Sequence, residues 1–197
     1  MTNSHFYYFA YGSCMCPVDL KRTMGEKIHP YVVGTGILKN YRLGFYRYSP
    51  TRKCGVLDVV PDANSTVHGV LYHLPQRLSD RLDRREGSPH AYKQEFVDIC
   101  FPGNNLENTS EKIYRQVRTY VVVNKSPTEV APDDTYFNVV LRGALTCGLP
   151  EEYCWNLFTK MYQLQCSNNS LISQYSYPVV ETLHATSLHT QNNHELT

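Results

Sequence analysis

The chain has 197 residues, with 19 Lys and Arg side chains against 18 Asp and Glu, so its formal net charge is +1 at pH 7. This balance argues against a nucleic-acid partner, because a protein that neutralises phosphates normally has a surplus of basic side chains. The 42% of hydrophobic residues can form a core, which excludes a highly charged disordered chain. We expect one globular domain over residues 1–166, followed by a polar tail, 167–197, that is extended or disordered.

Neither a membrane segment nor a secretory signal is expected. No stretch reaches the roughly 20 apolar residues that a transmembrane helix needs. The start, Met1 to His5, has no basic residue and no long apolar run after it. The 7 cysteines are odd in number and irregularly spaced, which disfavours a disulfide framework. These features predict a cytoplasmic protein with no membrane partner.

The aromatic run Phe6 to Ala10 predicts a buried strand at the start of the domain. Gly12 and Ser13 then favour a turn, and Pro17 suits the first turn of a short helix. The order is therefore strand, tight loop, helix.

Short β-branched or aromatic runs follow at intervals of roughly ten residues, with turn signals between them, which is typical of a sheet that curls or closes. The expected strands are Val32 to Leu38, Tyr41 to Tyr46, Val56 to Val60, Val67 to Leu74, Tyr92 to Cys100 and Val117 to Val123. Between the fourth and fifth strands, Pro75 to Arg85 reads as a helix that ends at Gly87.

Two helices are expected after the last strand. Asp133 and Asp134 stand where the cap of the first helix belongs. The second is amphipathic and runs from Glu151 to about Leu164. Its aromatic stripe is explained by core packing, although an exposed part could form a dimer contact, so a monomer and a homodimer both remain open.

The junction between the first strand and the first helix could bind an anion. Such a loop aims several backbone N–H groups at one point, and the helix dipole adds to them, which suits a carboxylate or a developing oxyanion. Gly12 permits a positive φ and lets a ligand approach the backbone closely. An ordinary strand–turn–helix connection explains the same pattern.

Glu86 ends the helix that precedes Gly87. It lies four residues after Leu82, which itself lies four after Leu78, so its side chain is expected on the apolar side of the helix. A carboxyl drawn into an apolar pocket has a raised pKa and can exchange protons near neutral pH. The alternative is a solvated glutamate paired with Arg85 or Lys93.

These residues, with further blocks in the same order, resemble the γ-glutamylcyclotransferases. The family opens with Tyr-Phe-Ala-Tyr-Gly-Ser-Asn and an apolar residue, which Tyr8 to Met15 match except at Cys14. Leu82-Asp83 and Glu86-Gly87 match its Leu-Asp helix and Glu-Gly pair. Further matches are Tyr41-Arg42-Leu43 with Phe45, Val67 to Leu74, Pro132, Tyr136, Gly143-Ala144, Gly148-Leu149-Pro150 and Tyr153.

The resemblance implies an α+β fold, a small mixed β-barrel flanked by helices, which needs no metal or cofactor and takes a small-molecule γ-glutamyl substrate. The expected reaction is internal: the α-amine of the γ-glutamyl group attacks its own side-chain carbonyl, forms 5-oxoproline and releases the amine. The substrate could be a γ-glutamyl amino acid, a γ-glutamylamine or glutathione. Glu86 would be the general acid and base. The expected substrate-binding residues are Tyr8, Phe9, Ala10, Tyr11, Gly12, Ser13, Cys14 and Tyr136.

Cys14 stands where the family has Asn, and the exchange keeps alternatives open. If the loop works through its backbone amides, Cys14 is tolerable; if the Asn side chain is needed, specificity is altered or activity is lost. A catalytically silent binding module and an amide hydrolase that releases glutamate are the alternative functions. A thiol nucleophile at Cys14 or Cys16 is disfavoured, because no His lies nearby in the sequence.

Overall fold

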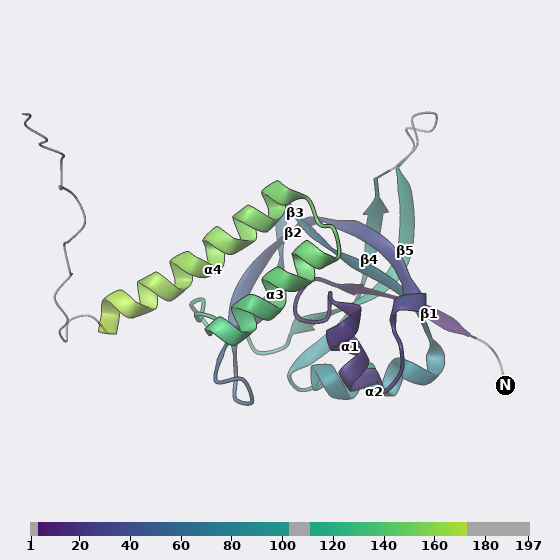
Figure 1. The fold of residues 1–197 in the computed structure, drawn as a ribbon, viewed down its shortest axis with the longest axis horizontal. Helices are drawn as coiled ribbons and strands as arrows, with labels where there is room; N and C mark the ends of the chain where they lie inside the picture. Colours follow the sequence, from purple (N-terminus) through teal and green to yellow (C-terminus); the bar gives the residue numbers. More distant parts are fainter. Residues whose placement is uncertain (1–3, 103–110, 173–197) are drawn as a thin grey trace, which may run out of the picture.

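The computed structural model describes residues 4–102 and 111–172. In these ranges a five-stranded barrel carries helices on its outside (Figure 1). The strands are β1 His5–Ala10, β2 Val32–Ser49, β3 Cys54–Pro75, β4 Tyr92–Phe101 and β5 Lys112–Val122. The helices are α1 Pro17–Met24, α2 Ser79–Glu86, α3 Asp134–Thr146 and α4 Glu151–Ile172, with short 3-10 turns η1 His29–Tyr31 and η2 Gln76–Leu78.

The barrel is closed and mixed, as the sequence predicts. Its strand order is β1-β3-β2-β4-β5, and β5 pairs again with β1. The pairing of β1 with β5 is parallel, with Tyr8 opposite Arg118, whereas the other pairings are antiparallel. Closure removes the open sheet edges, and large side chains such as Tyr72, Phe9 and Phe45 are fully buried.

The four strands expected between residues 32 and 74 are two continuous ones, which corrects the sequence interpretation. β2 and β3 form one long hairpin whose register shifts between Lys39 and Tyr41. Asn40, with φ of 62°, occupies this irregularity. The polar residues that resembled strand breaks form a bulge, and a bulge bends a strand without ending it.

α2 places Glu86 at its last position because its apolar side is fixed to the barrel. Leu78 and Leu82 are fully buried. Gly87 follows with φ of 61°, and its N–H donates to the carbonyl of Arg84. The left-handed glycine ends the helix in the usual way.

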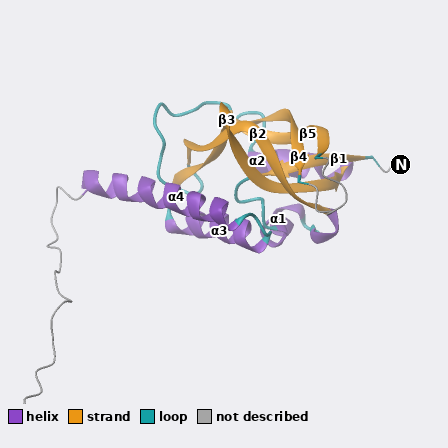
Figure 2. Cartoon of the chain, turned by 90° about the horizontal axis from the view of Figure 1, so that it is seen from above, coloured by secondary structure: helices purple, strands orange, loops and turns teal. Residues whose placement is uncertain are grey.

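α3 and α4 lie next to each other along one side of the barrel (Figure 2). Asp133 caps α3 as predicted, since its Oδ1 accepts the N–H of Tyr136 at 2.7 Å. α4 ends at Ile172 and not near Leu164, so residues 167–172 are helical and the expected extended tail cannot begin at 167. The rest of that tail, 173–197, lies outside the described residues, as does most of the polar insert 102–112.

Candidate active site

Two adjacent cavities lie between the β1–α1 loop, the end of α2 and the start of α3. The inner pocket has a volume of about 50 Å³ and adjoins an outer cleft of about 570 Å³. Four residues line both: Ser13, Glu86, Tyr92 and Tyr136. The other residues of the inner pocket are Tyr8, Tyr11, Gly12, Cys14 and Leu57.

Most of the residues predicted for the site meet at this inner pocket. Phe9 and Ala10 do not line it, which corrects the expectation for these two. Phe9 is fully buried and points into the barrel, where a Cβ added at Gly69 would lie 2.7 Å from its ring. Side chains alternate along a strand, so Phe9 and Tyr8 point to opposite sides of β1.

The loop after β1 offers backbone donors without partners. The N–H of Met15 donates to the carbonyl of Gly12 at 3.0 Å and closes the turn. Among the described residues, nothing accepts the N–H groups of Ser13 and Cys14, and both residues line the pocket. Gly12 does not use the positive φ that a glycine permits. A Cβ there would lie 3.4 Å from the Tyr136 hydroxyl, in ordinary van der Waals contact.

Glu86 faces the pocket from the end of α2, as the helix periodicity predicts. Its Oε1 accepts a hydrogen bond from the Cys14 thiol at 3.2 Å. Burial raises the pKa of the Glu86 carboxyl, and the positive charge of Arg85 offsets part of this rise. Lys93, the alternative partner of Glu86, instead lies 4.0 Å from Glu95. The carboxyl is thus suited to hold a proton during a reaction.

Cys14 connects Glu86 to Arg85. Arg85 Nε donates to Cys14 Sγ at 2.9 Å, and its NH1 donates to Thr23 Oγ1 at 2.7 Å. Burial, together with the charge of Glu86, raises the pKa of the Cys14 thiol to about 11. The thiol is therefore protonated at neutral pH and acts as a donor, which argues against a thiolate nucleophile at Cys14.

Two tyrosine hydroxyls hold the peptide groups of Leu57 on the opposite wall. Tyr136 accepts the N–H of Leu57 at 3.1 Å, and Tyr92 donates to its carbonyl at 2.9 Å. The hydroxyl hydrogen of Tyr136 has no acceptor among the described residues, so it remains available to a ligand. Tyr11 differs, because its hydroxyl donates to the carbonyl of Tyr120 at 2.5 Å. Tyr92 was not predicted, and nothing in its local sequence marks it.

Comparison with known proteins agrees with this architecture. Residues 66–157 match the model of the AIG2-like family. A Bacillus subtilis protein named "Putative gamma-glutamylcyclotransferase YkqA" is 31% identical over 139 residues, which are 70% of this chain and 46% of that protein. The crystal structure of YkqA superposes with a TM-score of 0.68 at 29% identity, covering 81% of this chain and 55% of YkqA. A structure named "Gamma-glutamyl cyclotransferase" shares the fold, with a TM-score of 0.66 at 22% identity over 78% of this chain and 86% of its own.

Together, the AIG2-like match, the similarity to YkqA and the shared fold support a γ-glutamylcyclotransferase-like family for this chain. It spans about half the length of YkqA. The order of sequence blocks, the mixed barrel and the two comparisons with YkqA lead to the same family.

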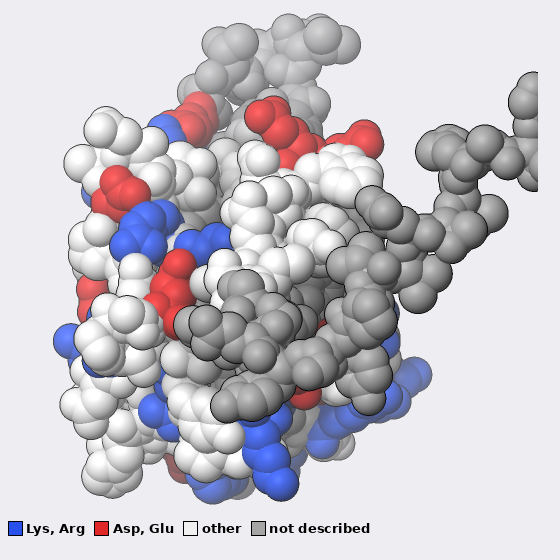
Figure 3. Space-filling model, turned by 90° about the vertical axis from the view of Figure 1, so that its left-hand side faces the viewer, with Lys and Arg blue, Asp and Glu red and all other residues white. Residues whose placement is uncertain are grey.

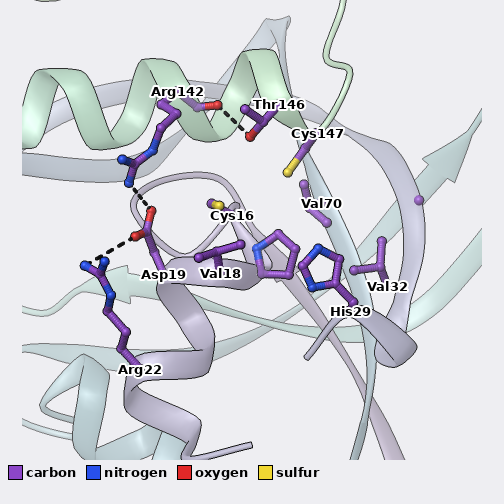
Figure 4. A pocket seen from close by; sticks show the side chains of 12 residues that line it. Cys16, Val18, Asp19, Arg22, His29, Val32, Val70, Arg142, Thr146 and Cys147 are labelled. Atoms are coloured by element: carbon purple, nitrogen blue, oxygen red, sulfur yellow. Dashed lines mark hydrogen bonds and ion pairs between the residues drawn. The ribbon is translucent and has the colours of Figure 1, made fainter. Parts of the chain in front are cut away.

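This γ-glutamylcyclotransferase-like chain has a second large cavity, of about 520 Å³, between α1, α3 and the start of β2 (Figure 4). None of the predicted site residues lines it. Asp19 lies between two arginines there: Arg142 NH2 is 2.7 Å from its Oδ2, and Arg22 NH1 is 3.8 Å from its Oδ1. Both arginines of this cavity thus have an anionic partner.

The described ranges hold neither a metal cluster nor a membrane-spanning helix. Residues 4–102 and 111–172 contain no group of three or more His, Cys, Asp or Glu side chains placed to hold a metal ion. None of the helices in these ranges is both long and apolar enough to cross a bilayer.

Proposed function

We propose that the chain is a γ-glutamylcyclotransferase that converts a γ-glutamyl amide into 5-oxoproline and the free amine. One observation carries the proposal: a glutamate with a raised pKa faces, across a small pocket, two backbone N–H groups without partners. The similarity to YkqA supports it. The reaction needs no cofactor, because the nucleophile and the electrophile belong to one molecule and gain from proximity.

Glu86 acts as general base and then as general acid. Its carboxylate removes a proton from the α-ammonium group of the substrate, and the resulting amine attacks the γ-carbonyl carbon. The tetrahedral intermediate collapses as Glu86 returns this proton to the leaving nitrogen and the bond between that nitrogen and the carbon breaks. The ring nitrogen then loses its second proton, which the released amine takes up as an ammonium ion. A carboxyl with a raised pKa serves both steps, because it accepts and releases a proton without a large energetic penalty.

The β1–α1 loop stabilises the negative charges. The N–H groups of Ser13 and Cys14 donate to the α-carboxylate of the substrate or to the oxyanion that forms on the γ-carbonyl. The free hydroxyl hydrogen of Tyr136 adds a donor from the opposite wall. Tyr8, which is almost fully buried, closes the pocket against water.

We also propose the cytoplasm as the place of action. All seven cysteines are free thiols in the structure, which supports the proposal that the enzyme works in the reducing cytoplasm.

A product analysis tests the proposed function. The wild-type chain is incubated with γ-glutamyl dipeptides, γ-glutamylamines and glutathione, and the products are identified by mass. We expect 5-oxoproline and the free amine from at least one substrate. Release of glutamate would instead indicate a hydrolase, and binding without turnover would indicate a silent binding module; either result contradicts the proposal.

A further inference from the structure

The outer cleft is strongly basic, although the chain as a whole is almost neutral. Its lining contains four arginines, Arg47, Arg52, Arg84 and Arg85, and Glu86 is its one carboxylate. Arg47 and Arg52 come from the β2–β3 hairpin, whereas Arg84 and Arg85 come from α2. Lys and Arg side chains gather toward the lower edge of the face in Figure 3, the level at which the tip of this hairpin lies in Figure 1.

Within the described part of the chain, three of the four guanidinium groups form neither a hydrogen bond nor an ion pair. Arg85 is held by Cys14 and Thr23. Among the described residues, the side chains of Arg47, Arg52 and Arg84 form neither an ion pair nor a hydrogen bond. Other arginines of the molecule behave differently: Arg77, Arg115 and Arg142 each pair with a carboxylate. Positive charge that is not neutralised within the fold attracts an anion from outside.

Two of these arginines are positioned by the tyrosines of the inner pocket. The guanidinium of Arg52 lies 5.1 Å from the ring centroid of Tyr136, and that of Arg47 lies 5.6 Å from the ring centroid of Tyr92. Cation–π contacts of this kind restrict the side chains and leave the N–H groups free. The positive charge is thus fixed where a substrate leaves the inner pocket.

The inner pocket, at about 50 Å³, has room only for the reacting end of a substrate, so the leaving amine must occupy the outer cleft. We propose that the outer cleft selects γ-glutamyl amides whose leaving amine is an acidic amino acid with two carboxylates, such as γ-glutamylglutamate. Guanidinium groups bind carboxylates through paired hydrogen bonds, and three unpartnered ones exceed what a single carboxylate needs. This inference rests on the proposed function.

A series of three substrates tests it. The leaving amines are ethylamine, alanine and glutamate, which carry zero, one and two carboxylates. We expect kcat/KM of the wild-type chain to rise in that order and the rise to shrink at high salt, where exposed charges are screened. Arg52→Gln and Arg84→Gln should each lower the ratio of kcat/KM for γ-glutamylglutamate to kcat/KM for γ-glutamylethylamide about tenfold.

Arg115→Gln is the matched control, because Arg115 is an exposed arginine of β5 that pairs with Asp98 and does not line the cleft. It should leave all three values unchanged. Two results would overturn the inference while the proposed function stands. One is an equal kcat/KM for the three substrates. The other is a loss of kcat/KM for γ-glutamylglutamate in Arg115→Gln as large as in the Arg52 and Arg84 variants. If no substrate yields 5-oxoproline, the proposed function fails. Equilibrium binding of γ-glutamylglutamate and γ-glutamylethylamide to the wild-type chain then tests the charge preference alone, and equal affinities would overturn it.

Discussion

The two large cavities have similar volumes, about 570 Å³ for the cleft beside Glu86 and about 520 Å³ for the cavity beside Asp19, but their polar groups differ. Asp19 is paired with Arg142 and Arg22. Beside Glu86, three arginines form neither an ion pair nor a hydrogen bond with the described residues, and the Glu86 carboxyl has a raised pKa. The two cavities therefore differ little in volume. They differ in whether their arginines are paired with a carboxylate.

This difference has a simple physical reading. Charges of one sign that gather without counter-charges repel one another and attract an oppositely charged ligand to the cleft. In the cavity beside Asp19 the arginines already have a counter-charge. Three arginines of the cleft beside Glu86 have none among the described residues, and the predictions below test that contrast.

Removing the carboxylate from each cavity gives the largest expected difference. Glu86→Gln should lower the release of 5-oxoproline about 10² to 10⁴-fold, which is the range that general acid–base catalysis contributes. Asp19→Asn should leave this rate unchanged, provided the folded fraction is matched by circular dichroism. Equal rates for Glu86→Gln and the wild type would remove the distinction between the cavities.

Tyr136→Phe tests how tightly the wall of the pocket is held. The N–H of Leu57 would lose its acceptor in a buried place, so the free energy of unfolding should fall by about 1–3 kcal/mol in urea titrations. The control is Tyr162→Phe, an exposed tyrosine of α4, whose effect should stay within about 0.5 kcal/mol. A loss no greater than that of the control would show that Tyr136 does not support Leu57.

Cys14→Ala tests the residue that departs from the family sequence. The thiol hydrogen bond lowers the pKa of Glu86, so its removal should raise that pKa further. Because the base must be ionised to react, the acid limb of the kcat/KM profile should move to higher pH. Cys14→Asn, whose amide can donate to the same carboxylate, should move the limb less. An unmoved limb in Cys14→Ala would mean that the thiol does not tune Glu86.

The raised pKa of Glu86 also predicts a small dependence of stability on pH. Its folded pKa is above the unfolded value, so the folded state binds more protons between the two, and stability falls as pH rises through this window. Glu86→Gln should not show this fall in stability, because a glutamine side chain does not titrate. The mutant should therefore be more stable relative to the wild type at pH 8 than at pH 4, as measured by urea unfolding. If the difference in the free energy of unfolding between Glu86→Gln and the wild type did not vary with pH, that result would contradict the raised pKa of Glu86.

The fold could be predicted from the sequence where local signals agree. The end of α2 was predictable, because Leu78, Leu82 and Gly87 define both the buried face and the last turn. The continuity of β2 and β3 was not, because the residues around Asn40 look like a turn and only pairing with the partner strand shows a bulge. The length of α4 was also missed, because polar residues after Cys166 do not distinguish a solvated helix from a tail.

The inner pocket was largely predictable and the outer cleft was not. Glu86 and the loop from Tyr11 to Cys14 follow from helix periodicity and from the strand–loop–helix order. Arg52 and Arg84 are far apart in the sequence, and only the packing of the β2–β3 hairpin beside α2 brings them together. Tyr92 is brought to the site in the same way, by the position of β4.

Reaction of the wild-type chain with a γ-glutamyl substrate in ¹⁸O-labelled water tests the central claim most directly. Internal cyclisation uses no water, so the account predicts 5-oxoproline without ¹⁸O. Glutamate that carries one ¹⁸O atom in its γ-carboxylate would show that water is the nucleophile and would contradict the account.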